Sequence, residues 1–271
     1  MILLGRDSLD SKDIYKLVKC YCDQRFGIPS QCVKSDNIRR VPRGYEENIL
    51  LKVNGKLGGR NKLVDVSNVS PKLKTDTMVV GMDVNHPGLG ETLGASISSA
   101  VGTYDSNYSM FSACARVQSK DRGEMIHAAD EMITELVDHY KVKNKKAPKN
   151  VFLFRDGVSE GQFDLVRQNE IPLIRKVLNQ NQIKLTYIIV QKRHNTRFVL
   201  RNPEMAGKKM TWNVPAGTVV DKSIIEPDQD IFYLNSHFSP LVSFFNIFVR
   251  FSSFIICIFS RVRRNRANIS F

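Results

Sequence analysis

The sequence predicts an α/β protein made of two units, and three observations support this prediction. Apolar runs such as residues 151–154, which are typical of buried strands, alternate with stretches whose apolar residues recur at helical spacing. A chain of 271 residues has room for one large domain or two small ones, each with its own core. Residues 1–75 carry mainly helical patterns, whereas strand and helix patterns alternate over residues 76–239.

The first unit is expected to hold two helices and a short strand. Asp10 and Ser11 can cap a helix, and four of its apolar residues share one face: Ile14, Leu17, Val18 and Tyr21. A short strand at residues 31–33 follows. The second helix is expected over residues 45–56 and ends at the glycine pair that begins with Gly58.

Basic and amide side chains in this unit form a candidate anion pocket. Tyr15 and Lys19 lie one helical turn apart, and Lys52 and Lys56 share a face of the later helix. Together with Gln31 they could hold a terminal phosphate through charge-assisted hydrogen bonds. Taken singly, each of them could equally be a solvated surface residue.

The second unit is expected to follow the element order of an RNase H-like domain. Three strands form an antiparallel meander, and a helix, a strand, a helix and a strand come after them. The expected ranges are 77–84, 96–102, 109–117, 122–140, 151–156, 161–179 and 184–190.

Two strands of this unit each deliver an aspartate into a glycine-rich turn. Asp83 follows one apolar run and Asp156 follows another. Hard carboxylate oxygens suit Mg²⁺ or Mn²⁺, so the pair predicts a divalent-metal site. The alternative is that each aspartate merely begins a turn, and His86 beside Asp83 is expected to be a turn residue.

Four segments resemble the PIWI domain of eukaryotic Argonaute proteins, in the order and spacing of that family. They are residues 81–87 (GMDVNHP), 155–163 (RDGVSEGQF), 191–197 (QKRHNTR) and 214–218 (VPAGT). The resemblance implies an RNase H-like PIWI domain over residues 76–239, incomplete at its end. It also implies a partial Rossmann-like MID domain over residues 1–75.

By the same resemblance, Asp83 and Asp156 match the two catalytic, metal-binding aspartates of the family, and Glu124 matches its third catalytic position. Glu124 has a competing interpretation, because Asp121 stands three residues before it in a capping-box pattern. The family's fourth ligand, a His or Asp, comes from a segment that this chain does not reach. Binding of Mg²⁺ or Mn²⁺ is therefore expected to be weak.

The resemblance also assigns RNA contacts. In the MID domain of Argonautes a pocket binds the guide's 5′ phosphate, and its motif positions are occupied here by Tyr15, Lys19, Gln31, Lys52 and Lys56. The segment 191–197 borders the guide channel in the family. It offers four side chains to a phosphate backbone: Lys192, Arg193, His194 and Arg197. A solvated basic loop is the alternative for that segment.

Residues 240–271 do not resemble the family and form an apolar, aromatic and then basic tail. Its length approaches that of a membrane span, but Arg250 in its middle would cost about 3 kcal/mol in lipid. A tail foreign to the fold, as in a truncated or mis-spliced gene product, is favoured over an anchor. No membrane partner is expected.

Composition agrees with a phosphate-rich partner and a reducing compartment. The formal net charge is +13 and the sequence pI is about 9.6, although a basic protein with nothing bound would give the same count. Five cysteines are scattered without metal-site spacing, which is typical of free thiols. The chain is therefore expected in the cytoplasm.

These observations predict a MID–PIWI protein that binds a small guide RNA and presents it to complementary target RNA in RNA-mediated gene silencing. Proteins of a silencing complex are expected partners. The alternative function is a metal-dependent endonuclease that cuts the guide-paired target RNA. A third possibility is an interaction module that binds no RNA.

Overall fold

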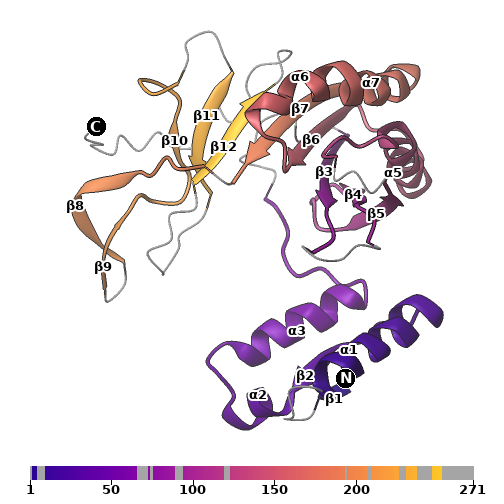
Figure 1. Ribbon diagram of the computed structural model, residues 1–271, viewed down its shortest axis with the longest axis vertical. Coiled ribbons are helices and arrows are strands. Elements are labelled where there is room, and N and C mark those ends of the chain that lie inside the picture. The colour runs from indigo at the N-terminus through magenta and orange to yellow at the C-terminus, as the bar shows by residue number, and fades with distance from the viewer. Residues whose placement is uncertain are drawn as a thin grey trace. The chain divides into compact units, whose positions relative to one another are not determined.

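The computed structural model describes residues 2–4, 10–65, 73, 76–88, 94–118, 123–192, 194–206, 209–225, 230–236 and 246–251, and the chain forms two compact units. Unit 1 is Met1–Val64 and unit 2 is Asp65–Phe271 (Figure 1). The contacts therefore divide the chain between residues 64 and 65. The predicted domain ranges themselves stay a prediction.

Unit 1 combines a small parallel sheet with helices. Strand β1 pairs with β2 from Ile2↔Cys32 to Leu4↔Lys34. The elements in chain order are β1 (Ile2–Leu4), α1 (Asp10–Lys19), η1 (Cys20–Arg25), β2 (Cys32–Lys34), α2 (Ser35–Arg40) and α3 (Tyr45–Lys56). Helix α3 has the predicted bounds, because Gly44 and Gly58 take positive φ values of 76° and 80° on either side of it.

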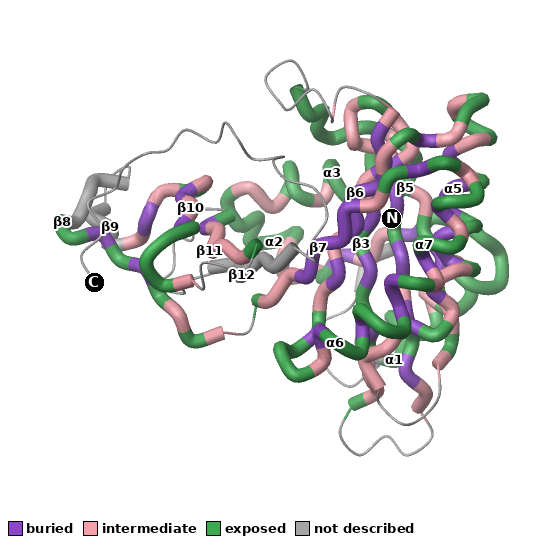
Figure 2. The backbone as a smooth tube through the Cα atoms, turned by 90° about the horizontal axis from the view of Figure 1, so that it is seen from above, coloured by how far each residue is buried: buried purple, intermediate pink, exposed green. Residues whose placement is uncertain are grey.

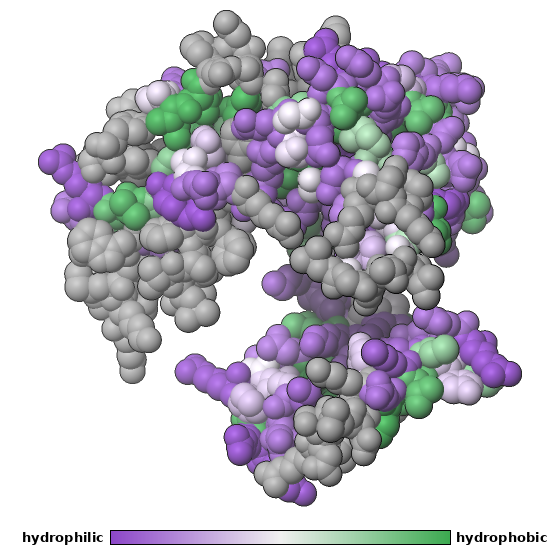
Figure 3. All heavy atoms as spheres, in the orientation of Figure 1, coloured by the Kyte–Doolittle hydropathy of each residue, from purple (hydrophilic) through white to green (hydrophobic). Residues whose placement is uncertain are grey.

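The apolar stripe predicted on the first helix is not buried among the described residues. Ile14 is 44% exposed, Leu17 is 58% exposed and Tyr21 is 48% exposed. A sheet of two three-residue strands offers too little surface to cover such a stripe. Hydrophobic side chains therefore lie on the surface of unit 1, between hydrophilic ones (Figure 3).

Unit 2 is built on an eight-stranded mixed sheet with the order β10-β11-β12-β7-β6-β3-β4-β5. Its strands are β3 (Thr77–Asn85), β4 (Ile97–Thr103), β5 (Phe111–Val117), β6 (Asn150–Asp156), β7 (Lys184–Gln191), β10 (Thr218–Val220), β11 (Ile231–Asn235) and β12 (Asn246–Phe251). The β3–β4–β5 meander is antiparallel, and β6 is parallel to both β3 and β7. The predicted RNase H-like order is thus present. A separate hairpin joins β8 (Val199–Ala206) and β9 (Lys209–Asn213).

The helices of unit 2 begin where backbone N–H groups can donate to carbonyl oxygens of the same helix. Helix α5 (Ala129–Asn144) begins at Ala129, later than the predicted residue 122. One reason is that the amide of Ile126 donates to Glu170 Oε2 at 3.3 Å rather than to a helical carbonyl. The second helical stretch comprises η3 (Glu160–Gln162), α6 (Phe163–Leu165), η4 (Val166–Glu170) and α7 (Ile171–Gln180), with a proline in the first turn of α7.

The main core lies where α5 packs on β4 and β5 and α7 packs on β7. Buried residues run along β3, β6 and β7 at the centre of the sheet (Figure 2). In β3 the residues Met78, Val80, Met82 and Val84 face this core. Because side chains alternate along a strand, Asp83 faces the opposite side of the sheet.

Part of the apolar tail takes a place in the sheet. The backbone of β12 pairs antiparallel with β11 on one side and with β7 on the other, from Phe248↔Gln191 to Phe251↔Ile188. The rest of the tail lies outside the described residues. Within the described part of the chain, we find no helix of the length and apolarity that crossing a membrane would require.

Candidate carboxylate site and phosphate pocket

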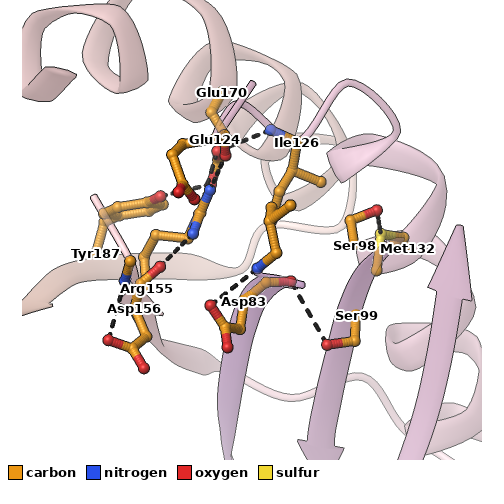
Figure 4. Close-up of polar contacts among 12 residues, drawn as sticks. Asp83, Ser98, Ser99, Glu124, Ile126, Met132, Arg155, Asp156, Glu170 and Tyr187 are labelled. Carbon is orange, nitrogen blue, oxygen red and sulfur yellow. Dashed lines mark hydrogen bonds and ion pairs between the residues drawn. The ribbon is translucent and has the colours of Figure 1, made fainter. Parts of the chain in front are cut away.

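Asp83 and Asp156 lie at the same edge of neighbouring parallel strands. Met82 of β3 is aligned with Arg155 of β6, so the next residue of each strand is an aspartate. Each carboxylate also accepts a local backbone bond, from the amide of Val84 at 2.9 Å and from that of Gly157 at 2.9 Å. Figure 4 shows both carboxylates pointing away from the buried polar group around Arg155.

Glu124 approaches Asp83 across a gap left by a glycine. A Cβ atom at Gly157 would lie 3.2 Å from Glu124 Oε2 and 3.3 Å from Asp83 Oδ1. Gly157 also has a φ of 89°, which favours glycine. The absence of a side chain at this position therefore lets two carboxylates face the same space.

His86 holds the other oxygen of Glu124. The ring Nε2 of His86 lies 3.0 Å from Glu124 Oε1, and Nδ1 lies 2.8 Å from Ser96 Oγ. Glu124 Oε2 is buried and has no hydrogen-bond partner among the residues that the structure describes. His86 was expected to be a turn residue, and its three-residue distance from Asp83 is the signal that could have marked it as part of the site.

The capping-box interpretation of Glu124 is wrong. Helix α5 starts five residues later, and its N-cap is Ala128, without a side-chain cap. Asp121, the other member of the proposed box, lies outside the described residues. Glu124 instead lies in a non-helical segment that precedes the helix, so its carboxylate is available to the site.

The buried guanidinium of Arg155 holds the backbone of the segment that carries Glu124. Arg155 is fully buried and donates to the backbone carbonyl oxygens of Glu124 and Asp156. Its Nε lies 3.1 Å from Glu170 Oε1, which also accepts the hydroxyl of Tyr187 at 2.6 Å (Figure 4). Burial, together with the negative charge of Glu170, raises the pKa of Tyr187, so its hydroxyl stays a donor. Sequence reasoning missed Arg155, although a charged residue inside an apolar strand was a visible signal.

Lys192 is paired with Asp156. Its ammonium forms an ion pair with Asp156 Oδ2, and the side chain of Lys192 is 56% exposed.

The oxygens of Asp83, Glu124 and Asp156 suit a hard divalent cation by their chemistry. Among the described residues, however, no three His, Cys, Asp or Glu side chains are close enough together to hold one.

Two other basic residues of the segment 191–197, His194 and Arg197, have local partners. Arg197 donates to the carbonyl oxygens of His194 at 2.6 Å and Thr196 at 2.8 Å. The ring of His194 lies edge-on to Tyr233, with centroids 5.4 Å apart. Arg193 lies outside the described residues. The assignment of these four residues to an RNA backbone stays a prediction.

Three of the five predicted phosphate-binding residues converge in unit 1. Lys19 Nζ lies 2.9 Å from the carbonyl oxygen of Ser30, and Lys56 Nζ lies 2.5 Å from the same oxygen. Lys56 also donates to Gln31 Oε1 at 2.8 Å. Two ammonium groups thus meet at one carbonyl oxygen, and the Gln31 amide contacts one of them, which is the kind of cluster that an anion needs.

The other two residues lie at the edge of this cluster. Tyr15 is 46% exposed and acts electrostatically on Lys19, one turn along α1. Lys52 is exposed on α3, one turn before Lys56. Burial and the nearby Lys19 lower the pKa of Lys56, whereas a hydrogen bond to Asp23 raises the pKa of Lys19.

Comparison with known proteins shows the family and the fold of this chain. The model of the family described as "Piwi domain" matches residues 1–241. The chain belongs to the Argonaute family. Protein argonaute 18 of Oryza sativa subsp. japonica is 35% identical over 244 residues, which are 87% of this chain and 22% of that protein. The chain therefore spans about a fifth of the length of the curated relatives that it matches.

Solved Argonaute structures match the fold over most of the chain. The Kluyveromyces polysporus Argonaute with a guide RNA gives a TM-score of 0.79 at 26% identity, covering 92% of this chain and 30% of that chain. The carboxyl-terminal lobe of a budding yeast Argonaute gives a TM-score of 0.80 at 27% identity, covering 92% of this chain and 52% of that chain. The fold is accordingly that of an Argonaute MID–PIWI region.

Proposed function

We propose that this Argonaute binds the 5′-phosphorylated end of a small guide RNA and presents the guide to complementary RNA, in RNA-mediated gene silencing in the cytoplasm. Proteins of a silencing complex are its further partners. A solved relative carries a guide RNA, and a net charge of +13 favours a polyanion. The observation that carries the proposal is the convergence of Lys19, Lys56 and Gln31 beside Ser30.

The test compares two versions of one short single-stranded RNA, with a 5′ phosphate and with a 5′ hydroxyl. Fluorescence anisotropy at fixed salt should give tighter binding of the phosphorylated form. The double variant Lys52→Ala/Lys56→Ala should abolish this preference, because both ammonium groups on that face of α3 are lost.

The double variant Lys16→Ala/Lys34→Ala is the matched control, since it removes the same charge from unit 1 at two exposed positions. It should weaken the binding of both RNAs equally and leave the ratio of their affinities unchanged. Equal affinities of the folded wild-type chain for the two RNAs would count against the pocket.

The second candidate function is metal-dependent cleavage of the target RNA. Glu124 Oε2 favours it, because this atom is buried, has no partner within the described part of the chain, and faces Asp83 across Gly157. A bound Mg²⁺ or Mn²⁺ would supply a Lewis acid that activates a water for attack on the phosphodiester. Asp83 and Glu124 are placed to hold the cation, while Arg155 fixes the backbone on both sides of the site.

Metal binding separates this candidate from guide binding alone. Titration with Mn²⁺, followed by electron paramagnetic resonance, should give weak binding that Asp83→Asn abolishes. Asp138→Asn is the control, because it removes one carboxylate from the exposed surface of α5. Equal Mn²⁺ binding by the wild type and Asp83→Asn would exclude the proposed metal site, whatever the guide-binding assay gives.

A further inference from the structure

Every donor of the Lys19 ammonium is already in use inside the phosphate pocket. Its nitrogen lies 2.9 Å from the carbonyl oxygen of Ser30, 2.9 Å from Ser30 Oγ and 3.0 Å from Asp23 Oδ2. An ammonium group has three N–H donors. Lys19 therefore has no donor to offer a phosphate while Asp23 stays in place.

Asp23 is held from two sides. It stands one turn after Lys19, and its second oxygen, Oδ1, accepts the hydroxyl of Ser30 at 3.1 Å. Bonding to Lys19 lowers the pKa of Asp23, so the carboxylate is ionised at neutral pH. The pocket thus contains a resident anion that bonds to the ammonium a phosphate would use.

Lys56 provides the remaining open position. It donates to the Ser30 carbonyl oxygen and to Gln31 Oε1. Its third donor has no acceptor within the part of the chain that the structure describes. A phosphate approaching this donor would meet the negative charge of Asp23, which bonds to the same residue, Ser30.

We propose that Asp23 is an internal stand-in for the terminal phosphate: the 5′ phosphate of a guide must displace it from Lys19, so Asp23 limits the affinity and the phosphate preference of the pocket. This inference rests on the proposed 5′-phosphate binding. The Asp23 side chain is 44% exposed, so it can turn into solvent when the phosphate takes its place.

The test uses the full chain with Asp23→Asn, which keeps the shape and an acceptor for Ser30 but removes the charge. Asp13→Asn is the matched control. Asp13 stands on α1, directly before the η1 segment that carries Asp23, and is 76% exposed beside Lys16. Both variants raise the net charge by one and change nonspecific attraction equally. Circular dichroism verifies that the wild type and every variant are folded.

Affinities for 5′-phosphate and 5′-hydroxyl RNA are measured by anisotropy at fixed salt. The affinity for 5′-phosphate RNA divided by that for 5′-hydroxyl RNA should rise about fivefold in Asp23→Asn. This ratio should stay at the wild-type value in Asp13→Asn. Asp23→Glu keeps the charge and should not raise the ratio. A ratio that rises in Asp23→Asn supports the stand-in role, even if the wild type has little preference.

Three outcomes overturn the inference. A ratio that is the same in Asp23→Asn and Asp13→Asn means that Asp23 does not compete. A ratio that falls in Asp23→Asn means that Asp23 builds the pocket instead. No phosphate preference in any of the four proteins removes both this inference and the proposed function, whereas a clear wild-type preference with an unchanged Asp23→Asn removes the inference alone.

Discussion

The guanidinium of Arg155 and the carboxylate of Glu170 form a fully buried ion pair beneath the carboxylate site. Both side chains are 0% exposed, and Arg155 Nε lies 3.1 Å from Glu170 Oε1. Since Arg155 also donates to the carbonyl oxygens of Glu124 and Asp156, the pair connects two candidate catalytic segments to the core.

Replacing Arg155 by methionine should therefore destabilise the protein by about 3–5 kcal/mol, because Glu170 would be left as an unpaired buried charge. Arg116→Met is the control. Arg116 bonds to Glu131 and Glu135 at the surface, and its loss should cost much less stability, because water screens exposed ion pairs. Urea unfolding measures both values. A cost for Arg155→Met no larger than that of Arg116→Met would contradict the role of the buried pair.

Lys192 should compete with a divalent cation for Asp156, because its ammonium occupies one of the carboxylate oxygens. Lys192→Ala is expected to raise the affinity for Mn²⁺ by about fivefold, the effect of removing a partly exposed ion pair. Calorimetric titration measures it, with Lys176→Ala on the exposed face of α7 as the control. An unchanged affinity in Lys192→Ala would show that Asp156 does not take part in metal binding.

Because of Tyr108, the stability of unit 2 should fall as the pH becomes alkaline. Burial raises the pKa of Tyr108 to about 12 from an ordinary value near 10, and its hydroxyl donates to the carbonyl oxygen of Leu73 at 2.5 Å. The folded state holds the proton more tightly than the unfolded state. The resulting stability is fully present below pH 10 and is lost as the pH rises towards 12.

Tyr108→Phe should remove this dependence and cost about 1 kcal/mol at neutral pH through the lost hydrogen bond. Urea unfolding of both proteins between pH 8 and 12 gives the comparison. A stability difference that does not shrink above pH 10 would argue against a raised pKa of Tyr108.

The tail should contribute to the sheet through β12. A chain that ends at residue 252 keeps β12, whereas a chain that ends at Pro240 leaves residues 188–191 of β7 without this partner strand. An unpaired strand edge invites association. The shorter chain should therefore melt earlier and form more oligomer in size-exclusion chromatography. Equal melting and equal oligomer content would mean that β12 adds nothing to the fold.

Local patterns were sufficient to predict the strands that carry Asp83 and Asp156 and the helix α3, but not the non-helical segment that carries Glu124. The apolar runs before Asp83 and Asp156 predicted two strands, and their register brings both aspartates to one edge of the sheet. The bounds of α3 were predictable because glycines with positive φ stand at both ends. Helical spacing likewise predicted that Lys52 and Lys56 share a face.

Tertiary structure decided which side chains those elements meet. Glu124 bonds to His86 across 38 residues of sequence, and the backbone of the Glu124 segment is held by Arg155 across 31. The start of α5 depends on the distant Glu170, and the exposure of the α1 stripe depends on how much sheet unit 1 provides. Local sequence determines backbone conformation over a few residues. The partner of a polar side chain is set by strand register and packing, and these depend on contacts between residues that are far apart in the chain.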